Sequence, residues 1–160
     1  MFDITLITMG KLKEKFYISA AQEYTKRLSG YCHFTLVELP ESRLPESPSP
    51  AEVQRALAAE AVAIRERLPK GGAVIALCIE GKQISSEELA QFLADRANSG
   101  AGDVAFVIGS SHGLSDEVKR AAALRFSMGR ITMPHQLARL VLTEQIYRAC
   151  TINAGMKYHK

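Results

Sequence analysis

The hydrophobic positions along the chain follow two different periods. Short runs rich in apolar and β-branched residues recur at intervals and are predicted as strands. Two of them, residues 73–79 and 104–108, are apolar throughout, which is typical of strands buried on both faces of a sheet. The other predicted strands are residues 4–9, 33–39 and 124–128, with a further extended segment at 130–133.

Between these strands the apolar residues recur every three or four positions, which predicts amphipathic helices. Ser85 and Glu88 have the spacing of a capping box and mark the start of one helix. Ser115, which two acidic residues follow, marks the start of a shorter one. The predicted helices are residues 11–28, 51–68, 86–98, the short helix after residue 115, and 136–150, with a polar and basic tail at 151–160.

Strands and helices therefore alternate about five times, which is typical of an α/β fold with a mostly parallel sheet and flanking helices. Residues 40–50 contain four prolines and three serines and are predicted as a loop, too short to link two domains. We expect residues 1–160 to form one domain. In such folds ligands bind beyond the carboxyl ends of the strands. The candidate binding segments are thus residues 80–85, 109–114 and 128–135.

The composition excludes several classes of protein. The chain has 160 residues, of which 47% are hydrophobic and 23% charged, as is ordinary for a globular protein. No apolar run approaches the roughly 20 residues of a membrane helix, and the N-terminus lacks the pattern of a secretory signal. Neither the three cysteines nor the four histidines have the spacing of a metal site. We therefore expect a soluble, cytoplasmic protein without a metal.

The charge is distributed unevenly along the chain. The net charge is +3, but residues 118–160 contain eight Lys and Arg against a single acidic residue, Glu144. Neighbouring cations repel one another unless a partner neutralises them, so this segment favours binding to a polyanion. On a surface without such a partner the same charge would only promote solubility.

Residues 109–113, Gly-Ser-Ser-His-Gly, match the G-x-S-x-G pattern of α/β-hydrolases, with Ser111 as the nucleophile. A catalytic triad also needs an acid and then a histidine later in the chain. With Glu144 as the acid, only His159 follows as the histidine. Glu144, however, is expected to form an ion pair with Arg148, four residues on. The alternative is a glycine-rich turn in which the backbone approaches a ligand closely. The chain contains neither the glycine-rich motif of dinucleotide-binding proteins nor the P-loop motif, so neither kind of phosphate-binding site is predicted.

Residues 128–135 form a glycine-bearing extended segment that leads into a helix at Pro134. Beside the turn at 109–113, such a segment can line a slot of the size of adenine, with Met128, Ile131 and Met133 as apolar walls. The alternative is that these three side chains belong to the hydrophobic core, which is the usual place for Met and Ile.

Several segments together resemble the bacterial ribosomal RNA large-subunit methyltransferase H family, which belongs to the SPOUT class. No one of them would suffice, but their combination is specific, and the resemblance extends over the whole chain. They are VIALCIEGK at 74–82, Ile-Gly at 108–109 with Gly-Leu-Ser at 113–115, the Thr132–Pro134–His135 group, LTEQIYRA at 142–149, and the Tyr-His-Lys ending at 158–160.

The resemblance implies a trefoil-knotted α/β fold and a homodimer. It implies the transfer of a methyl group from S-adenosyl-L-methionine to N3 of a pseudouridine in the 23S rRNA of the assembled ribosome. The family often has Gly-Gly-Pro-Glu-Gly at 109–113, so Ser110 is a departure. The cofactor contacts that the resemblance implies are Leu77, Gly109, Met128, Gly129, Arg130, Ile131, Thr132 and Met133.

Methylation at N3 requires the loss of a proton, and histidine titrates near neutral pH. The candidate bases are His159, which we place first, and His135, which could instead be a helix-start residue bonded to the local backbone. Tyr158 is a candidate to stack on a splayed base. Arg139, one turn after His135, is expected to meet an rRNA phosphate or the cofactor carboxylate, or else to be a plain surface arginine.

Residues 137–142 are apolar on nearly all sides apart from Arg139, which predicts that one face of this helix meets a second copy of the chain. Three functions stay open. The methyltransferase follows from the resemblance, a serine hydrolase would use Ser111, and a non-catalytic ribosome-binding module would rest on the charge asymmetry.

Overall fold

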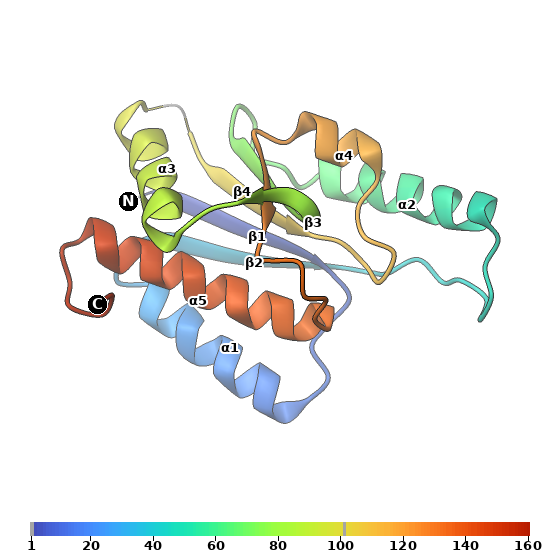
Figure 1. Cartoon of the computed structure of the whole chain (residues 1–160), viewed down its shortest axis with the longest axis horizontal. Helices are drawn as coiled ribbons and strands as arrows, with labels where there is room; N and C mark the ends of the chain where they lie inside the picture. The colour runs from blue at the N-terminus through green and yellow to red at the C-terminus, as the bar shows by residue number, and fades with distance from the viewer. Residues whose placement is uncertain (1, 101) are drawn as a thin grey trace.

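The computed structural model describes residues 2–100 and 102–160, and within them five strands alternate with five helices (Figure 1). This alternation confirms the α/β pattern expected from the hydrophobic periods. The elements are β1 (Asp3–Met9), α1 (Lys15–Leu28), β2 (His33–Leu39), α2 (Pro50–Arg65), β3 (Ala73–Gln83), α3 (Ser86–Asn98), β4 (Val104–Ile108), α4 (Asp116–Ala121), β5 (Leu124–Ser127) and α5 (His135–Asn153).

The strands form one sheet in the order β2-β1-β4-β3-β5, and all four neighbouring pairs are parallel. Strand β4 lies in the middle, and all five of its residues are buried, as its apolar sequence predicts. Helices α1, α3 and α5 pack on one face of the sheet, and α2 and α4 pack on the other (Figure 1). The sheet is therefore covered on both faces, and its strand ends are the accessible edges.

Serine caps set the starts of three helices. The predicted capping box at Ser85 and Glu88 is confirmed for α3, and a second box at Ser49 and Glu52 starts α2 at the end of the proline-rich segment. Ser115 accepts a hydrogen bond from a backbone N–H in the first turn of α4. Local sequence chemistry thus fixes where the chain turns into each of these helices.

The structure differs from the sequence predictions at several element ends. Strand β3 continues to Gln83 rather than ending at residue 79, and it does so through a bulge, because Leu77 and Lys82 both pair with Phe126. Helix α1 starts later and α2 ends earlier than predicted, whereas α5 continues to Asn153. Residues 130–133 form no strand.

Among the described residues no helix is long and apolar enough to cross a membrane. The same residues contain no group of three or more side chains that could hold a metal ion. The trefoil knot and the single domain stay predictions.

Candidate functional site

A cavity of about 710 Å³ opens at the carboxyl ends of β3, β4 and β5. This is the edge of the sheet where the α/β rule predicts a ligand. Its walls come mainly from three stretches, residues 77–80, 108–114 and 128–135, with Lys119 and Ala138 beside them. Two of the three predicted segments thus line this cavity, whereas of residues 80–85 only Glu80 reaches it.

The first wall is the bulge of β3. Because residues 78–81 bulge out of the ladder with β5, the strand carries Cys78, Ile79 and Glu80 into the cavity. Gly81 closes the bulge against β5, and a Cβ atom at this position would lie 2.7 Å from the Arg125 carbonyl carbon. At the rim, Lys119 pairs with Glu80 and holds the pKa of that carboxyl below its usual range.

The second wall is a tight turn at residues 109–113. The Gly113 N–H donates to the Ser110 carbonyl at 2.8 Å, and Gly113 has a φ of +82°. A Cβ atom on Gly109 would lie 2.2 Å from the Gly113 carbonyl oxygen, so only glycine fits there. At Gly109 and Gly113 the turn therefore contributes backbone alone to the cavity wall.

The third wall is the irregular segment between β5 and α5. The Gly129 N–H donates to Ser127 Oγ at 3.2 Å, and the same hydroxyl donates back to the Gly129 carbonyl at 3.1 Å. Ile131 is 83% exposed, so the alternative that it belongs to the core is wrong, whereas half-buried Met128 packs against the core and also lines the cavity. Arg130 is exposed and does not belong to the lining.

The cavity fits the S-adenosylmethionine that the resemblance implies. Its volume is that of a site for a small cofactor, and its walls combine apolar side chains with backbone amides and carbonyls. Because Gly109 has no side chain, the Gly113 carbonyl can close on it, and the backbone of this tight turn lies in the cavity wall. Seven of the eight predicted contact residues line this cavity, namely Leu77, Gly109, Met128, Gly129, Ile131, Thr132 and Met133.

The two candidates on α5 have different surroundings. His135 is the first residue of the helix, half-buried, and lies in the cavity wall. Arg139 is 2% exposed, and its guanidinium donates to Glu38 Oε2 at 2.6 Å and to the Gly10 carbonyl at 2.7 Å. The alternative that Arg139 is a plain surface arginine is therefore wrong, and in the single chain its guanidinium is occupied by Glu38 and Gly10. Its contact with an RNA phosphate or the cofactor carboxylate stays a prediction. Helical spacing predicts the face of α5 on which Arg139 lies. It cannot predict the hydrogen-bond partners of Arg139, which are 101 and 129 residues away in the sequence.

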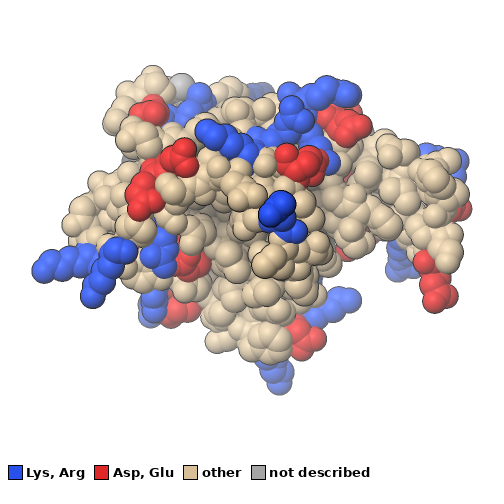
Figure 2. Space-filling model, viewed as in Figure 1, with Lys and Arg blue, Asp and Glu red and all other residues tan. Residues whose placement is uncertain are grey.

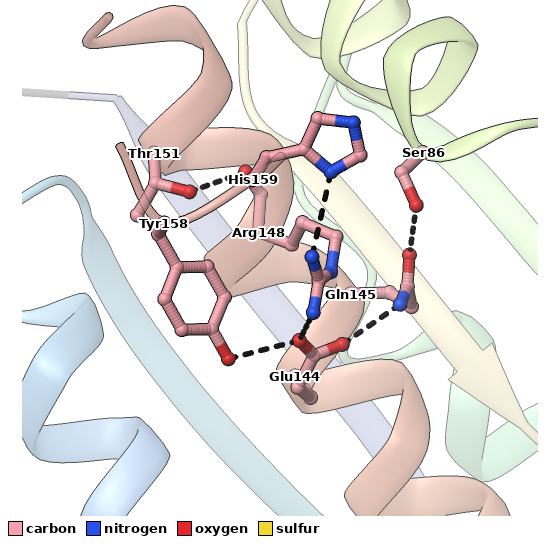
Figure 3. A network of polar contacts seen from close by, with 7 residues as sticks. All are labelled: Ser86, Glu144, Gln145, Arg148, Thr151, Tyr158 and His159. Atoms are coloured by element: carbon pink, nitrogen blue, oxygen red, sulfur yellow. Dashed lines mark hydrogen bonds and ion pairs between the residues drawn. The ribbon is translucent and has the colours of Figure 1, made fainter. Parts of the chain in front are cut away.

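The two tail candidates belong to a polar cluster at the other end of α5, which we call the tail cluster. It consists of Glu144, Arg148, Tyr158 and His159, which Figure 3 shows, together with Glu87 of α3. The predicted ion pair of Glu144 with Arg148 is confirmed. The Tyr158 hydroxyl donates to Glu144 Oε1 at 3.0 Å, and the Arg148 guanidinium lies 4.9 Å from the Tyr158 ring centre. Burial is the first cause that raises the pKa of Tyr158 to about 12.

His159 is held at both ring nitrogens. Its Nε2 lies 2.7 Å from Glu87 Oε1, and its Nδ1 lies 3.4 Å from Arg148 Nη1. Arginine can only donate, so Nδ1 accepts and the proton on Nε2 is donated to Glu87. The lone pair that a base would use is thus occupied in this arrangement. None of the tail-cluster residues lines the cavity, so one chain does not bring His159 or Tyr158 to it.

The hydrolase interpretation finds no support in the geometry. Ser111 is exposed, and its Oγ donates to Glu41 Oε1 at 3.3 Å. Within residues 2–100 and 102–160 no hydrogen bond joins Ser111 to a histidine, which a triad requires. The glycine-rich turn is the interpretation that the structure supports.

A buried carboxyl group, which the sequence did not lead us to predict, lies behind the same turn. Glu60 of α2 is 5% exposed, and its Oε1 accepts a hydrogen bond of 3.0 Å from Ser110 Oγ. A signal was present, because Glu60 lies three residues after Leu57 and four before Ile64, on the apolar face of its helix. A carboxylate at such a position needs a polar partner, and the serine is that partner.

Comparisons with known proteins agree with this geometry. The family model described as "Predicted SPOUT methyltransferase" matches residues 2–159. The chain is 48% identical over 158 residues to the ribosomal RNA large subunit methyltransferase H of Ligilactobacillus salivarius, covering 99% of each chain. It is 46% identical over 157 residues to the enzyme of the same name from Streptococcus uberis, covering 98% of this chain and 99% of the relative.

Solved structures share the fold at low sequence identity. One is described as a probable methyltransferase from Bordetella pertussis, with a TM-score of 0.54, 18% identity, and coverage of 92% of this chain and 95% of the other. Another comes from work on the 2-OH methylation of C/U34 on tRNA, with a TM-score of 0.51, 20% identity, and coverage of 94% and 97%. These likenesses bear on the fold alone.

Proposed function

The chain belongs to the SPOUT methyltransferase family, and from this premise we propose that it methylates the RNA of the large ribosomal subunit with S-adenosylmethionine as the methyl donor. The relatives of that name match it from end to end. The observation that carries the proposal is the cavity at the strand ends. One of its walls is the turn at 109–113, in which only glycine fits at position 109. We propose further that the target is N3 of a pseudouridine in the 23S rRNA of the assembled ribosome, as the sequence resemblance implies.

The donor, when bound, supplies a methyl group already activated on a sulfonium. The chain's own residues have to bind the donor, orient it and remove the N3 proton. Backbone groups of Leu77, Gly109 and the segment 128–133 are the proposed donor contacts, and the apolar side chains of the same walls exclude water. Arg130 is the one predicted contact that we now expect outside the pocket.

Two histidines are candidates to accept the proton. His135 lines the cavity of its own chain. His159 sits at the far end of α5, held by Glu87 and Arg148. We propose His159 as the base and Tyr158 as the stacking residue, acting at the cavity of a second copy. In that arrangement the tail leaves its resting contacts when the rRNA binds.

A homodimer fits the surface of α5. Leu137, Leu140 and Val141 are each only half-buried, beside exposed Ile131. Apolar side chains in that state gain free energy when a second copy covers them. A dimer of this kind would place the tail of one protomer near the cavity of the other. We propose one catalytic domain per chain, acting in the cytoplasm, where ribosomes are found.

Positive charge supports an RNA substrate. On the face drawn in Figure 2, Lys and Arg side chains gather along the upper edge, over α4 and the end of β3. Of the eight cations from residue 118 on, Lys119, Arg139 and Arg148 pair with carboxylates, and phosphates can neutralise the five others. The same charge also favours the second candidate, a ribosome-binding module without catalysis.

The test is incubation of the protein with methyl-labelled S-adenosylmethionine and ribosomes that lack the modification, followed by nuclease mapping of the label. We expect label on one pseudouridine of 23S rRNA, and less of it as salt rises, because salt weakens phosphate contacts. Tight ribosome binding without label would overturn the methyltransferase and leave the binding module. Label on another nucleotide would overturn the finer assignment alone.

A further inference from the structure

A carboxyl group lies directly behind the cavity turn and has no part in the function proposed so far. Glu60 Oε1 accepts the hydrogen bond from Ser110 Oγ, and Glu60 Oε2 is buried with no hydrogen-bond partner among the described residues. Ser110 is itself only 7% exposed. Burial of a carboxyl group with half of its bonding capacity unused costs stability, so its presence in the core calls for a reason.

Among the described residues no Lys or Arg pairs with Glu60. The titratable groups that face it are Glu41, which comes after β2, and His112 of the cavity turn. Burial is the first cause that raises the pKa of Glu60, and Glu41 raises it further, while Ser110, the Ser42 backbone and His112 oppose the shift. Among the described residues, the Ser110 hydroxyl is therefore the side chain that hydrogen-bonds to the Glu60 carboxyl group.

A second carboxylate, that of Glu41, accepts hydrogen bonds from Ser111, the next residue of the turn. Glu41 Oε1 accepts hydrogen bonds from the Ser111 N–H at 3.4 Å and from Ser111 Oγ at 3.3 Å. These contacts are long and exposed, so they contribute less than the buried bond of Ser110. The turn is thus tied to the rest of the molecule on its outer side by two serines, while its inner side faces the cavity.

We propose that Glu60 is a positioning residue for the donor-binding turn, which it holds through Ser110 in the conformation that receives S-adenosylmethionine. The proposal rests on the proposed function and names the part of the protein that sets donor affinity. The backbone pairing within the turn joins Ser110 and Gly113, so a support from α2 adds to what fixes its amides. Glu41, which belongs to the proline-rich segment 40–49, adds weaker hydrogen bonds to the turn at Ser111.

The test measures donor binding by calorimetry in the absence of RNA, for Glu60→Ala, Glu60→Gln and Ser110→Ala. Loss of one buried hydrogen bond to the turn is expected to weaken S-adenosylmethionine binding about tenfold in Glu60→Ala and in Ser110→Ala. Glu60→Gln keeps a side-chain oxygen as acceptor and is expected to stay within about threefold of the wild type. Because Glu60 and Ser110 act through the same hydrogen bond, their effects should not add. The double variant Glu60→Ala/Ser110→Ala should lose no more donor affinity than the single variant with the larger loss.

Two further readouts separate positioning from simple loss of fold. Amide hydrogen exchange of residues 110–113 in the donor-free protein should be faster in Glu60→Ala, with exchange in β4 unchanged. In turnover, the KM for the donor should rise while kcat at saturating donor stays near that of the wild type. The matched control is Glu66→Gln, which removes an exposed carboxylate from the end of the same helix and should change neither quantity.

Several results would overturn the proposal. They are wild-type donor affinity in Glu60→Ala or Ser110→Ala, additive losses in the double variant, or a loss in Glu60→Gln as large as in Glu60→Ala. If Glu60→Ala does not fold, Ser110→Ala, which deletes one hydroxyl, decides the question. Failure of the wild-type protein itself to bind S-adenosylmethionine would contradict the proposed function, which is a different outcome.

Discussion

The cavity and the tail cluster lie at opposite ends of α5 and are built in opposite ways. The cavity takes its shape from backbone, because glycines at 109 and 113 let the chain turn where strands end. The tail cluster takes its shape from charged and aromatic side chains that reach one another across α5, α3 and the C-terminus (Figure 3). Along the helix, His135 and Arg148 are ~20 Å apart at 1.5 Å per residue.

This difference assigns different tasks to the two regions. A pocket built from backbone is rigid and tolerates no added atom at its tightest points. A cluster of side chains that are partly exposed can be exchanged for other contacts at small cost, because such ion pairs contribute little. In the proposed function the rigid region receives the donor, and the exchangeable region belongs to the tail, which has to move to the substrate.

The largest effect should come from deleting Tyr158–Lys160. If His159 is the base, turnover on ribosomes should fall about 1,000-fold, because general-base catalysis supplies an effect of this order. Donor affinity, measured by calorimetry, should stay near that of the full chain, since none of these residues lines the cavity. Met156→Ala, just before the deleted residues and exposed, is the control. Undiminished turnover would exclude His159 and leave His135 as the base.

The next effect concerns the tightest point of the cavity. In Gly109→Ala the new Cβ atom would lie 2.2 Å from the Gly113 carbonyl oxygen, so the turn has to open. Overpacking of this kind costs about 2 kcal/mol, and we expect a loss of donor affinity of about 30-fold in calorimetry. Gly30→Ala is the control, because its Cβ atom would lie 3.7 Å from its nearest neighbour. Equal affinities of the two variants would show that the donor does not use this turn.

The sequence predicted the cavity better than the tail cluster, for a physical reason. The fully apolar stretches at 73–79 and 104–108 mark the central strands, and topology alone then brings the loops after them to one edge. The ion pair of Glu144 with Arg148 was also predictable, because the two residues are one helical turn apart. Information that is local in the sequence, or that follows from strand order, was therefore recovered.

Contacts between segments far apart in the sequence were not recovered. The pairing of His159 with Glu87 spans 72 residues, and that of Ser110 with Glu60 spans 50. The polar end of β3 looked like a loop, because only Lys82 and Gln83 pair with β5 there, after the bulge at residues 78–81. Arg139 looked like a ligand-binding residue, since no pattern in the chain announces that Glu38 will neutralise it.

A smaller effect is expected at the other glycine of the cavity. Gly129 has a φ of +124°, but a Cβ atom there would meet nothing within 4 Å. Gly129→Val therefore brings backbone strain without a clash, which costs about 1–2 kcal/mol and should weaken donor binding about tenfold. The protein should stay folded by circular dichroism. Retained binding of S-adenosylmethionine in this variant would show that the 128–133 segment is not part of the donor site.

The smallest effect tests whether the tail rests on α3 in the free protein. The backbone N–H at the start of α3 is the first cause, and His159 the second, that lower the pKa of Glu87 to about 2. A carboxyl group whose pKa is depressed keeps its contacts above its ordinary range and loses them as the pH falls toward about 2.

In His159→Ala the pKa of Glu87, followed by carboxyl ¹³C shifts in NMR, should therefore rise part of the way to its ordinary value, because the helix amide remains. The capping box of Ser85 and Glu88 at the start of the same helix is the internal control, and its backbone amide shifts should be alike in both proteins. An unchanged Glu87 pKa would mean that the tail is free in solution. A rise would mean that the tail is docked, and that rRNA has to compete with Glu87 for His159 before methylation can start.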